Sequence, residues 1–436
     1  MIHVAIVSLG CNKNLVDSEV MAGYLKNAGF AFAEQPQEAD VIIVNTCGFI
    51  QEAKEEAIDT ILQMAQYKKH HCKALLVTGC LTQRYPQAIA DMPEVDGVLG
   101  TYAYETIARA VSNVLEGKKI VDTSGNAEYL DKPIERIIST KYYAYLKIAE
   151  GCDNRCAYCA IPFIRGGYVS RSEESLLREA AELKEKGIKE IILTAQDTTR
   201  YGMDRGSLRF AALLEKIALL GFEWVRVMYT YPSTVGEDVI SVMESHKNIC
   251  KYIDMPIQHT EDEMLRAMNR HYTKADLIRI LERMRESKAE WTLRTTLLCG
   301  FPGETERQHK KMMDFIRQYR FDHLGVFAFS CEEGTEAEKM PHQCRRSTAL
   351  RRCDDIMLLQ GQLAHEYHKR REGKCYKTLA EGFDESQQLW YGRTDFLAPE
   401  VDGKVYFSGN GVEPGNFYNV LIEEAFGYDF FGRVVE

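Results

Sequence analysis

The stretch Gly151-Cys152-Asp153-Asn154-Arg155-Cys156-Ala157-Tyr158-Cys159 places three cysteines on one short loop. Three residues separate the first two cysteines and two residues separate the last two. A 4Fe-4S cluster normally takes one cysteine thiolate on each iron. A loop with three thiolates therefore fits three corners of such a cluster and leaves the fourth iron open to another ligand.

Zinc or unrelated buried thiols are the alternatives for this loop. A structural zinc site usually needs a fourth Cys or His at knuckle spacing, and no second CxxC or HxxxH accompanies the run. The spacing is instead the signature of radical S-adenosylmethionine (SAM) enzymes, in which SAM binds the fourth iron. Tyr158 is a candidate for contact with the adenine of SAM, although its ring could equally fill a gap beside the cluster.

The length and composition favour a soluble multidomain protein. A chain of 436 residues can form two or three domains with sizeable cores. It has no apolar run of the ~18 residues that a membrane helix needs, and its start lacks the features of a signal peptide. Thirteen cysteines scattered through a large chain indicate metal binding in a reducing compartment. We expect a cytoplasmic protein with no membrane partner.

The distribution of charge indicates the kind of partner. The net charge is −10, and residues 375–436 carry four basic against eleven acidic side chains, which is −7 for that segment alone. A phosphate backbone is bound by clustered Lys and Arg. The acidic end of the chain therefore favours a basic partner over a nucleic acid.

Residues 1–120 alternate short apolar runs with helical patterns, which predicts a doubly wound α/β domain. A cysteine follows each of three predicted strands: Cys11, Cys47 and Cys80. A lone cysteine after a strand usually packs in the core. Three at equivalent positions would converge at the carboxyl edge of a parallel sheet, where ligands bind. We expect a second three-thiolate site there, and we interpret residues 116–136 as a polar linker.

Residues 138–371 show six strand-and-helix units, which predicts a partial (β/α)6 barrel of parallel strands. The predicted strands are Tyr143–Ala149, Glu190–Thr194, Trp224–Tyr229, Tyr252–Met255, Thr292–Leu298 and Leu324–Phe329. Residues 374–436 contain strands separated by Gly, Pro, Asn and Asp turns, which predicts a small antiparallel barrel.

Polar or glycine-rich residues follow several barrel strands, at the face where a ligand would bind. These residues could also have purely structural roles. Gly300-Phe301-Pro302-Gly303 could be only a tight turn, and a lone histidine is more often structural than catalytic. The candidates for SAM contact are Gln196, Asp197, Gly300 and Glu304, and the candidates for substrate chemistry are Gln258 and His259.

By these features the chain resembles, over almost its full length, the methylthiotransferases, which are radical SAM enzymes with two 4Fe-4S clusters. That family has an N-terminal cluster domain, a radical SAM partial barrel and a C-terminal TRAM domain. The resemblance implies that Cys11, Cys47 and Cys80 hold the auxiliary cluster. It implies that Cys152, Cys156 and Cys159 hold the cluster that binds SAM.

Within the family, the run from Ser8 to Glu19 (SLGCNKNLVDSE) looks like the RimO branch, as do Arg294-Thr295-Thr296 and Tyr428-Asp429. That branch methylthiolates the β-carbon of an aspartate in small-subunit ribosomal protein twelve, and a low-potential electron donor would serve it. The chain departs from the family pattern at Cys299 and Cys331, which we expect to be packing substitutions.

Two other functions are considered. The MiaB branch methylthiolates isopentenyl-adenosine in tRNA, and it typically reads Gly-Cys-Gln-Met-Asn around the first cysteine. A tRNA substrate would favour a basic C-terminal domain, whereas residues 375–436 carry a net charge of −7. An iron-sulfur carrier without catalysis would have no need of a partial barrel with glycine-rich loops. We therefore expect methylthio transfer to the ribosomal protein.

Overall fold

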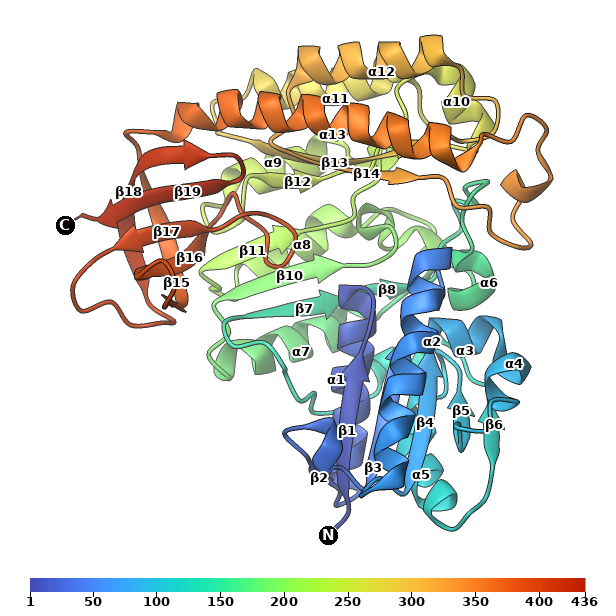
Figure 1. The fold of residues 1–436 in the computed structure, drawn as a ribbon. Helices are drawn as coiled ribbons and strands as arrows, with labels where there is room; N and C mark the ends of the chain where they lie inside the picture. The colour runs from blue at the N-terminus through green and yellow to red at the C-terminus, as the bar shows by residue number, and fades with distance from the viewer. Residues whose placement is uncertain (436) are drawn as a thin grey trace.

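The computed structural model describes residues 1–435, so Glu436, the last residue of the predicted C-terminal barrel, lies outside the described residues. Three parts follow one another along the chain: an N-terminal α/β part, a central part rich in parallel strands and a C-terminal barrel (Figure 1). In residues 1–435, no helix combines the length and the hydropathy that a membrane crossing requires.

The N-terminal part is a six-stranded parallel sheet in the order β2-β1-β3-β4-β5-β6. Alternate side chains along each strand face opposite sides of the sheet. Val41 and Ile43 pack with α1 and α5, whereas Ile42 and Val44 pack with α2, α3 and α4. The bounds are β1 His3–Ser8, α1 Asn12–Asn27, β2 Ala31–Phe32, β3 Val41–Thr46, α2 Gln51–Ala65, β4 Ala74–Gly79, α3 Cys80–Arg84, α4 Pro86–Ala90, β5 Gly97–Leu99, α5 Ile107–Leu115 and β6 Ile120–Asp122. The predicted doubly wound arrangement is confirmed.

One segment differs from the prediction. The stretch 116–136, predicted as a linker, contains β6, whose three residues pair in parallel with β5 at the edge of the sheet. A strand of three residues is too short to show an alternating pattern, and it is stabilised by its neighbour rather than by its own sequence.

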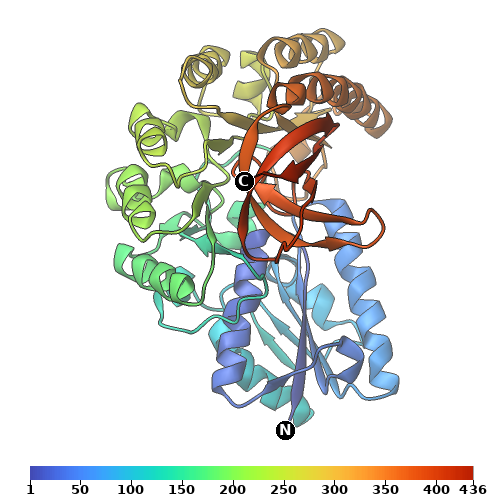
Figure 2. The ribbon, with the colours of Figure 1, turned by 90° about the vertical axis from the view of Figure 1, so that its left-hand side faces the viewer.

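The central part has six parallel strands in two sheets of three, β11-β10-β7 and β12-β13-β14. An isolated parallel bridge joins Val225 to Ile249, which lies just before the second sheet. The predicted six-unit partial barrel is confirmed, and its helices line the outer side (Figure 2). The strands are β7 Tyr143–Lys147, β8 Ala149–Glu150, β9 Val169–Ser170, β10 Glu190–Thr194, β11 Trp224–Val227, β12 Tyr252–Asp254, β13 Thr292–Cys299 and β14 His323–Ala328. The helices are α6 Ile161–Arg165, α7 Glu173–Glu185, α8 Phe210–Ala218, α9 Glu237–Ser245, α10 Asp262–Ala267, α11 Lys274–Arg285, α12 Glu306–Tyr319 and α13 Arg346–His368.

The first predicted barrel strand is interrupted. The prediction ran from Tyr143 to Ala149, but β7 ends at Lys147, and Ala149 pairs in antiparallel fashion with Ser170 of β9. The chain therefore leaves the barrel sheet just before the cysteine loop, which begins at Gly151.

The C-terminal part is a closed five-stranded barrel in the order β15-β16-β17-β19-β18. The predicted small all-β barrel is confirmed, although β17 and β19 pair in parallel rather than antiparallel. Its strands are β15 Cys375–Asp384, β16 Leu389–Thr394, β17 Val405–Ser408, β18 Phe417–Phe426 and β19 Asp429–Val434.

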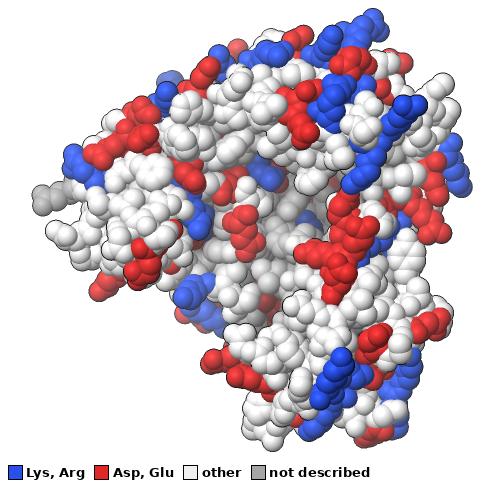
Figure 3. Space-filling model, viewed as in Figure 1, with Lys and Arg blue, Asp and Glu red and all other residues white. Residues whose placement is uncertain are grey.

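A shared apolar cluster joins the three parts. It contains Val16 and Val20 of α1, Tyr145 of β7, Trp224 of β11 and Leu379 of β15. The surface is hollowed where the three parts meet (Figure 3). The carboxyl ends of β1 and β3 and those of the barrel strands are thereby held in a fixed relation.

Candidate functional site

The first three cysteines lie at the carboxyl ends of β1, β3 and β4, at the place where the strand order of the sheet reverses. Cys11 precedes α1, and Cys80 begins α3. Gly10 has φ +85°, and a Cβ there would lie 2.8 Å from the Cβ of Cys47. Only glycine lets the Cys11 segment approach Cys47 so closely. The structure thus brings together the three positions that the sequence singled out.

The pKa values of two thiols in this first set, Cys47 and Cys80, are raised. Burial raises the pKa of Cys80 to about 12, although the Arg165 guanidinium opposes the shift and the nearby thiols of Cys47 and Cys11 add to it. Burial also raises the pKa of Cys47 above its ordinary value. A coordinating metal deprotonates such thiols outright. A set of three converging thiols beside an arginine fits an iron-sulfur cluster.

Arg165 connects this set with the barrel. Its Nη2 donates to Cys80 Sγ at 3.3 Å, and its Nη1 donates to Asp17 Oδ2 at 2.7 Å and Glu150 Oε2 at 2.9 Å. Lys147 pairs with the same two carboxylates, and all four charged side chains are buried. Two cations and two anions thus balance within the interface between α1 and the barrel.

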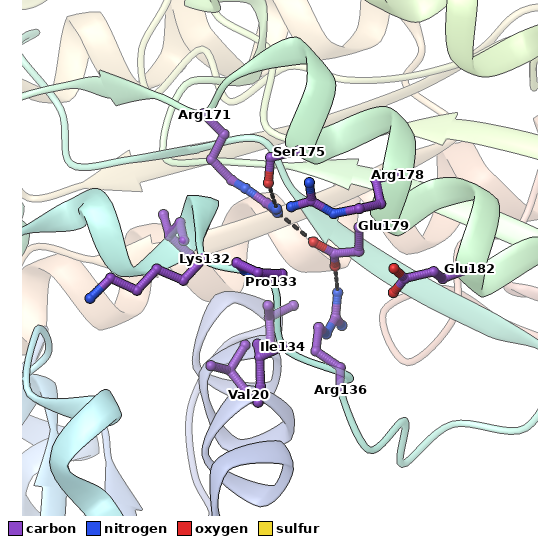
Figure 4. A pocket seen from close by; sticks show the side chains of 12 residues that line it. Val20, Lys132, Pro133, Ile134, Arg136, Arg171, Ser175, Arg178, Glu179 and Glu182 are labelled. Carbon is purple, nitrogen blue, oxygen red and sulfur yellow. Dashed lines mark hydrogen bonds and ion pairs between the residues drawn. The ribbon is translucent and has the colours of Figure 1, made fainter. Parts of the chain in front are cut away.

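Arg171, by contrast, forms an ordinary ion pair. Its Nη1 lies 2.6 Å from Glu179 Oε2, and Arg136 donates to the other oxygen of that carboxylate (Figure 4). The adjacent cavity has a volume of about 30 Å³. That is enough for roughly one or two waters, so this pocket does not fit an organic ligand.

The second three cysteines lie on the loop between β8 and α6. Gly151 has φ +74°, and a Cβ there would lie 2.0 Å from the carbonyl oxygen of Gly167. The Cys159 amide donates to the Cys156 carbonyl at 2.9 Å, which closes the loop on itself. Burial raises the pKa of Cys152 to about 12. This second set of three thiols on one loop also fits an iron-sulfur cluster.

Arg270 is a neighbour of the second set that the sequence analysis missed. Its Nη1 lies 3.4 Å from Cys156 Sγ and 3.4 Å from the Tyr158 hydroxyl, and its Nη2 donates to the Pro256 carbonyl at 2.7 Å. No motif contains Arg270, so only the tertiary structure identifies it. Tyr158 also packs edge-on against Phe301, with 6.4 Å between ring centroids.

Gln196 and Asp197 both contact the elements that hold the second loop. Gln196 Nε2 donates to Glu150 Oε1 at 2.7 Å, and Asp197 Oδ2 accepts from Asn154 of the loop at 2.8 Å. Burial raises the pKa of Asp197 to about 6. These side chains therefore support the loop from the end of β10.

The remaining candidates form a buried group outside the cysteine loop. His259 Nε2 lies 3.5 Å from Glu304 Oε1, and Glu304 Oε2 accepts from Arg352 of α13 at 2.9 Å. Gly300 has φ +79°, and a Cβ there would lie 2.3 Å from the Cβ of Ala349. Gly300 therefore allows close packing against α13.

Gln258 is half-buried and has φ +64°. Its backbone N–H donates to the Thr296 carbonyl at 2.8 Å, which extends the pairing with β13.

The two unusual cysteines differ in their surroundings. Cys299 is buried in the barrel core, in agreement with the expected packing role. Cys331 is exposed, so the expectation of a packing role was wrong for this residue. It lies on the loop that follows β14.

Comparison with protein families gives three successive matches. Residues 3–100 match the Uncharacterized protein family UPF0004, residues 146–316 match the Radical SAM superfamily, and residues 373–435 match the TRAM domain. Among solved structures, the radical SAM methyltransferase TsrM from Kitasatospora setae, with cobalamin and a [4Fe-4S] cluster bound, is similar in fold. The two structures superpose with a TM-score of 0.57 and 13% sequence identity, over 75% of this chain and 72% of TsrM.

Curated proteins match over nearly the whole chain. The protein named ribosomal protein uS12 methylthiotransferase RimO from Acetivibrio thermocellus is 46% identical, over 99% of this chain and 98% of its own. Its namesake from Pelotomaculum thermopropionicum is 45% identical, over 100% and 99%. Such identity, together with the three domains in the same order, shows that the chain belongs to the RimO family of radical SAM methylthiotransferases.

Proposed function

We propose that this protein adds a methylthio group to the β-carbon of an aspartate in small-subunit ribosomal protein twelve, uS12, with two 4Fe-4S clusters and SAM as cofactors. The observation that carries the proposal is identity of 46% to a protein named for that activity, in a chain with two separate three-cysteine sets. A ribosomal substrate also favours the cytoplasm as the site of action.

In this proposal Cys152, Cys156 and Cys159 hold the cluster that binds SAM, and Cys11, Cys47 and Cys80 hold the auxiliary cluster. When bound, the clusters and SAM supply hydrogen abstraction from an unactivated carbon and the methylthio group itself. A low-potential donor of unspecified identity provides the electrons.

The chain's own side chains have positioning roles. Arg165 opposes the burial that raises the pKa of Cys80, and Arg270 places positive charge 3.4 Å from Cys156 Sγ. Asp197 holds the second loop through Asn154. Cys80 is buried, whereas Cys11 is exposed and the other four cysteines are half-buried.

We further propose that Tyr158, Gln196 and Asp197 border the SAM site, since all three contact the second loop or its supports. Gly300 and Glu304 would shape that site from the end of β13, because the Gly300 amide donates to the Glu304 carboxylate. Gln258 is a candidate for substrate contact, and His259 would position Glu304.

The test is an anaerobic reaction of the reconstituted protein with SAM and reductant, in which uS12 and unmodified tRNA are offered separately and weighed by mass spectrometry. We expect a methylthio mass gain on one aspartate of uS12 alone. A gain on tRNA alone would contradict the proposal and would leave the acidic C-terminal barrel without an explanation.

A further inference from the structure

The first turn of α1 lies over the mouth of the barrel. Asn12 Oδ1 accepts from Thr194 Oγ1, at the end of β10, at 3.3 Å. Lys13 Nζ lies 3.3 Å from the centre of the Tyr229 ring, just beyond β11. This turn directly follows Cys11, so it is placed between the first cysteine set and the carboxyl ends of two barrel strands.

Lys13 is a buried cation without a carboxylate. Its exposed fraction is 8%, and within residues 1–435 it has no ion pair and no side-chain hydrogen bond. A buried unpaired ammonium group costs several kcal/mol. The face of Tyr229 offsets part of that cost, whereas the N-terminus of the 16-residue helix adds positive potential. The position therefore favours an anion, and no carboxylate of residues 1–435 pairs with Lys13.

Three other cations, Arg294, Arg165 and Arg270, already have partners. Arg294 Nη1 lies 2.7 Å from Asp254 Oδ1, and Arg165 pairs with Asp17 and Glu150. Arg270 contacts Cys156 and the Pro256 carbonyl. Lys13 differs from these three in having only an aromatic face against its charge.

Tyr229 is itself held in an unusual conformation. Its φ is +58°, which is rare for a bulky residue, and its amide donates to Asp254 Oδ2 at 3.1 Å. Strained backbone of this kind persists where the surroundings enforce it, and it gathers at functional sites. The hydrogen bond to Asp254 thus helps to hold the backbone of Tyr229, the residue whose ring Lys13 contacts.

We infer that Lys13 binds the side-chain carboxylate of the substrate aspartate and so selects aspartate over uncharged residues. The inference rests on the proposed function, because that function supplies a carboxylate bonded to the carbon that is modified. A charge-assisted hydrogen bond to this carboxylate would orient the β-carbon toward the mouth of the barrel. Lys13 would therefore be a specificity-determining residue.

The test measures binding rather than turnover. The anaerobic holoenzyme is titrated with fluorescently labelled uS12 and with uS12 in which the modified aspartate is replaced by asparagine. The unchanged enzyme is expected to prefer the aspartate form by roughly 30-fold or more. Lys13→Met, with an uncharged side chain of similar length, is expected to bind both forms equally, and Lys13→Arg is expected to keep most of the preference.

Lys184→Met is the matched control, since Lys184 also lies over an aromatic ring, 5.5 Å from the centre of Phe222, but on the outer helix α7. It should keep the full preference. Undiminished preference in Lys13→Met would overturn the inference.

A structural role is tested by iron content. If Lys13→Met and Lys13→Gln both lose iron while Lys13→Arg retains it, Lys13 balances the charge of a cluster and the inference is wrong. If the unchanged enzyme neither binds nor modifies uS12, the proposed function itself fails. Modification of uS12 by an enzyme whose preference ignores Lys13 would refute the inference alone.

Discussion

Arg165 is a single residue that links the two cysteine sets. It is the last residue of α6, which follows the second cysteine loop, and its guanidinium contacts Cys80 of the first set. Arg165→Met would remove a buried cation that pairs with both Asp17 and Glu150. We expect the free energy of unfolding to fall by about 3–5 kcal/mol and iron at the first set to be lost. Chemical denaturation and iron analysis measure both effects.

Arg317→Met is the control for this change, because Arg317 forms an exposed pair with Asp314 on α12. Exposed pairs contribute little to stability. An Arg165→Met variant as stable and as rich in iron as Arg317→Met would show that the buried network does not support the first set.

Glu179 makes the stability depend on pH. Burial would raise its pKa, but Arg171 and Arg136 lower it from 4.5 to about 2. A group with a lowered pKa stabilises the fold above its unfolded pKa, and that contribution is lost as the pH falls through the folded pKa. Glu179→Gln should therefore be less stable than the unchanged protein at pH 7, with a difference that narrows between about pH 4.5 and pH 2. Urea unfolding at several pH values checks this, and a pH-independent difference would contradict it.

The conformation of the second cysteine loop depends on Gly151. Gly151→Ala would force a methyl group to within 2.0 Å of the Gly167 carbonyl oxygen at a φ of +74°. We expect the loop to open and about half of the iron to be lost, as measured by iron and protein analysis. Gly187→Ala is the control: its φ is +86°, but no atom lies within 4 Å of the added carbon. Equal iron in both variants would show that the close approach at Gly151 is unimportant.

The elements themselves were largely predictable from sequence. The six barrel strands are buried apolar runs between amphipathic helices, and such runs signal parallel strands without tertiary information. The edge strand Ile120–Asp122 was missed because its pairing with β5 decides its structure. The contacts of Arg165 with Cys80 and of Arg270 with Cys156 were also out of reach, since they join residues 85 and 114 positions apart. The second cysteine set could be singled out because its spacing carries chemistry by itself, and the first set because each of its cysteines follows a predicted strand.

The C-terminal barrel is attached to the rest of the molecule by a buried ion-pair group. Glu190 of β10 accepts from Arg226 at 2.6 Å and from Arg393 of β16 at 2.7 Å. Arg393→Met would remove one of the cations that connect the two parts. We expect the free energy of unfolding to fall by about 3 kcal/mol. We also expect faster proteolysis in the connecting segment, residues 369–374.

Arg433→Met serves as the control for the barrel, because Arg433 forms an exposed pair with Glu423 within it. Proteolysis at the same rate in both variants would mean that Glu190 and Arg393 do not hold the barrel in place.

In the proposed function, the two cysteine sets serve different parts of one reaction. The most direct test measures 5′-deoxyadenosine and methylthiolated uS12 in the same anaerobic reaction, for the unchanged protein, Cys47→Ala and Cys156→Ala. The account predicts both products from the unchanged protein, 5′-deoxyadenosine alone from Cys47→Ala and neither from Cys156→Ala. Methylthiolated uS12 from Cys47→Ala, or 5′-deoxyadenosine from Cys156→Ala, would contradict it.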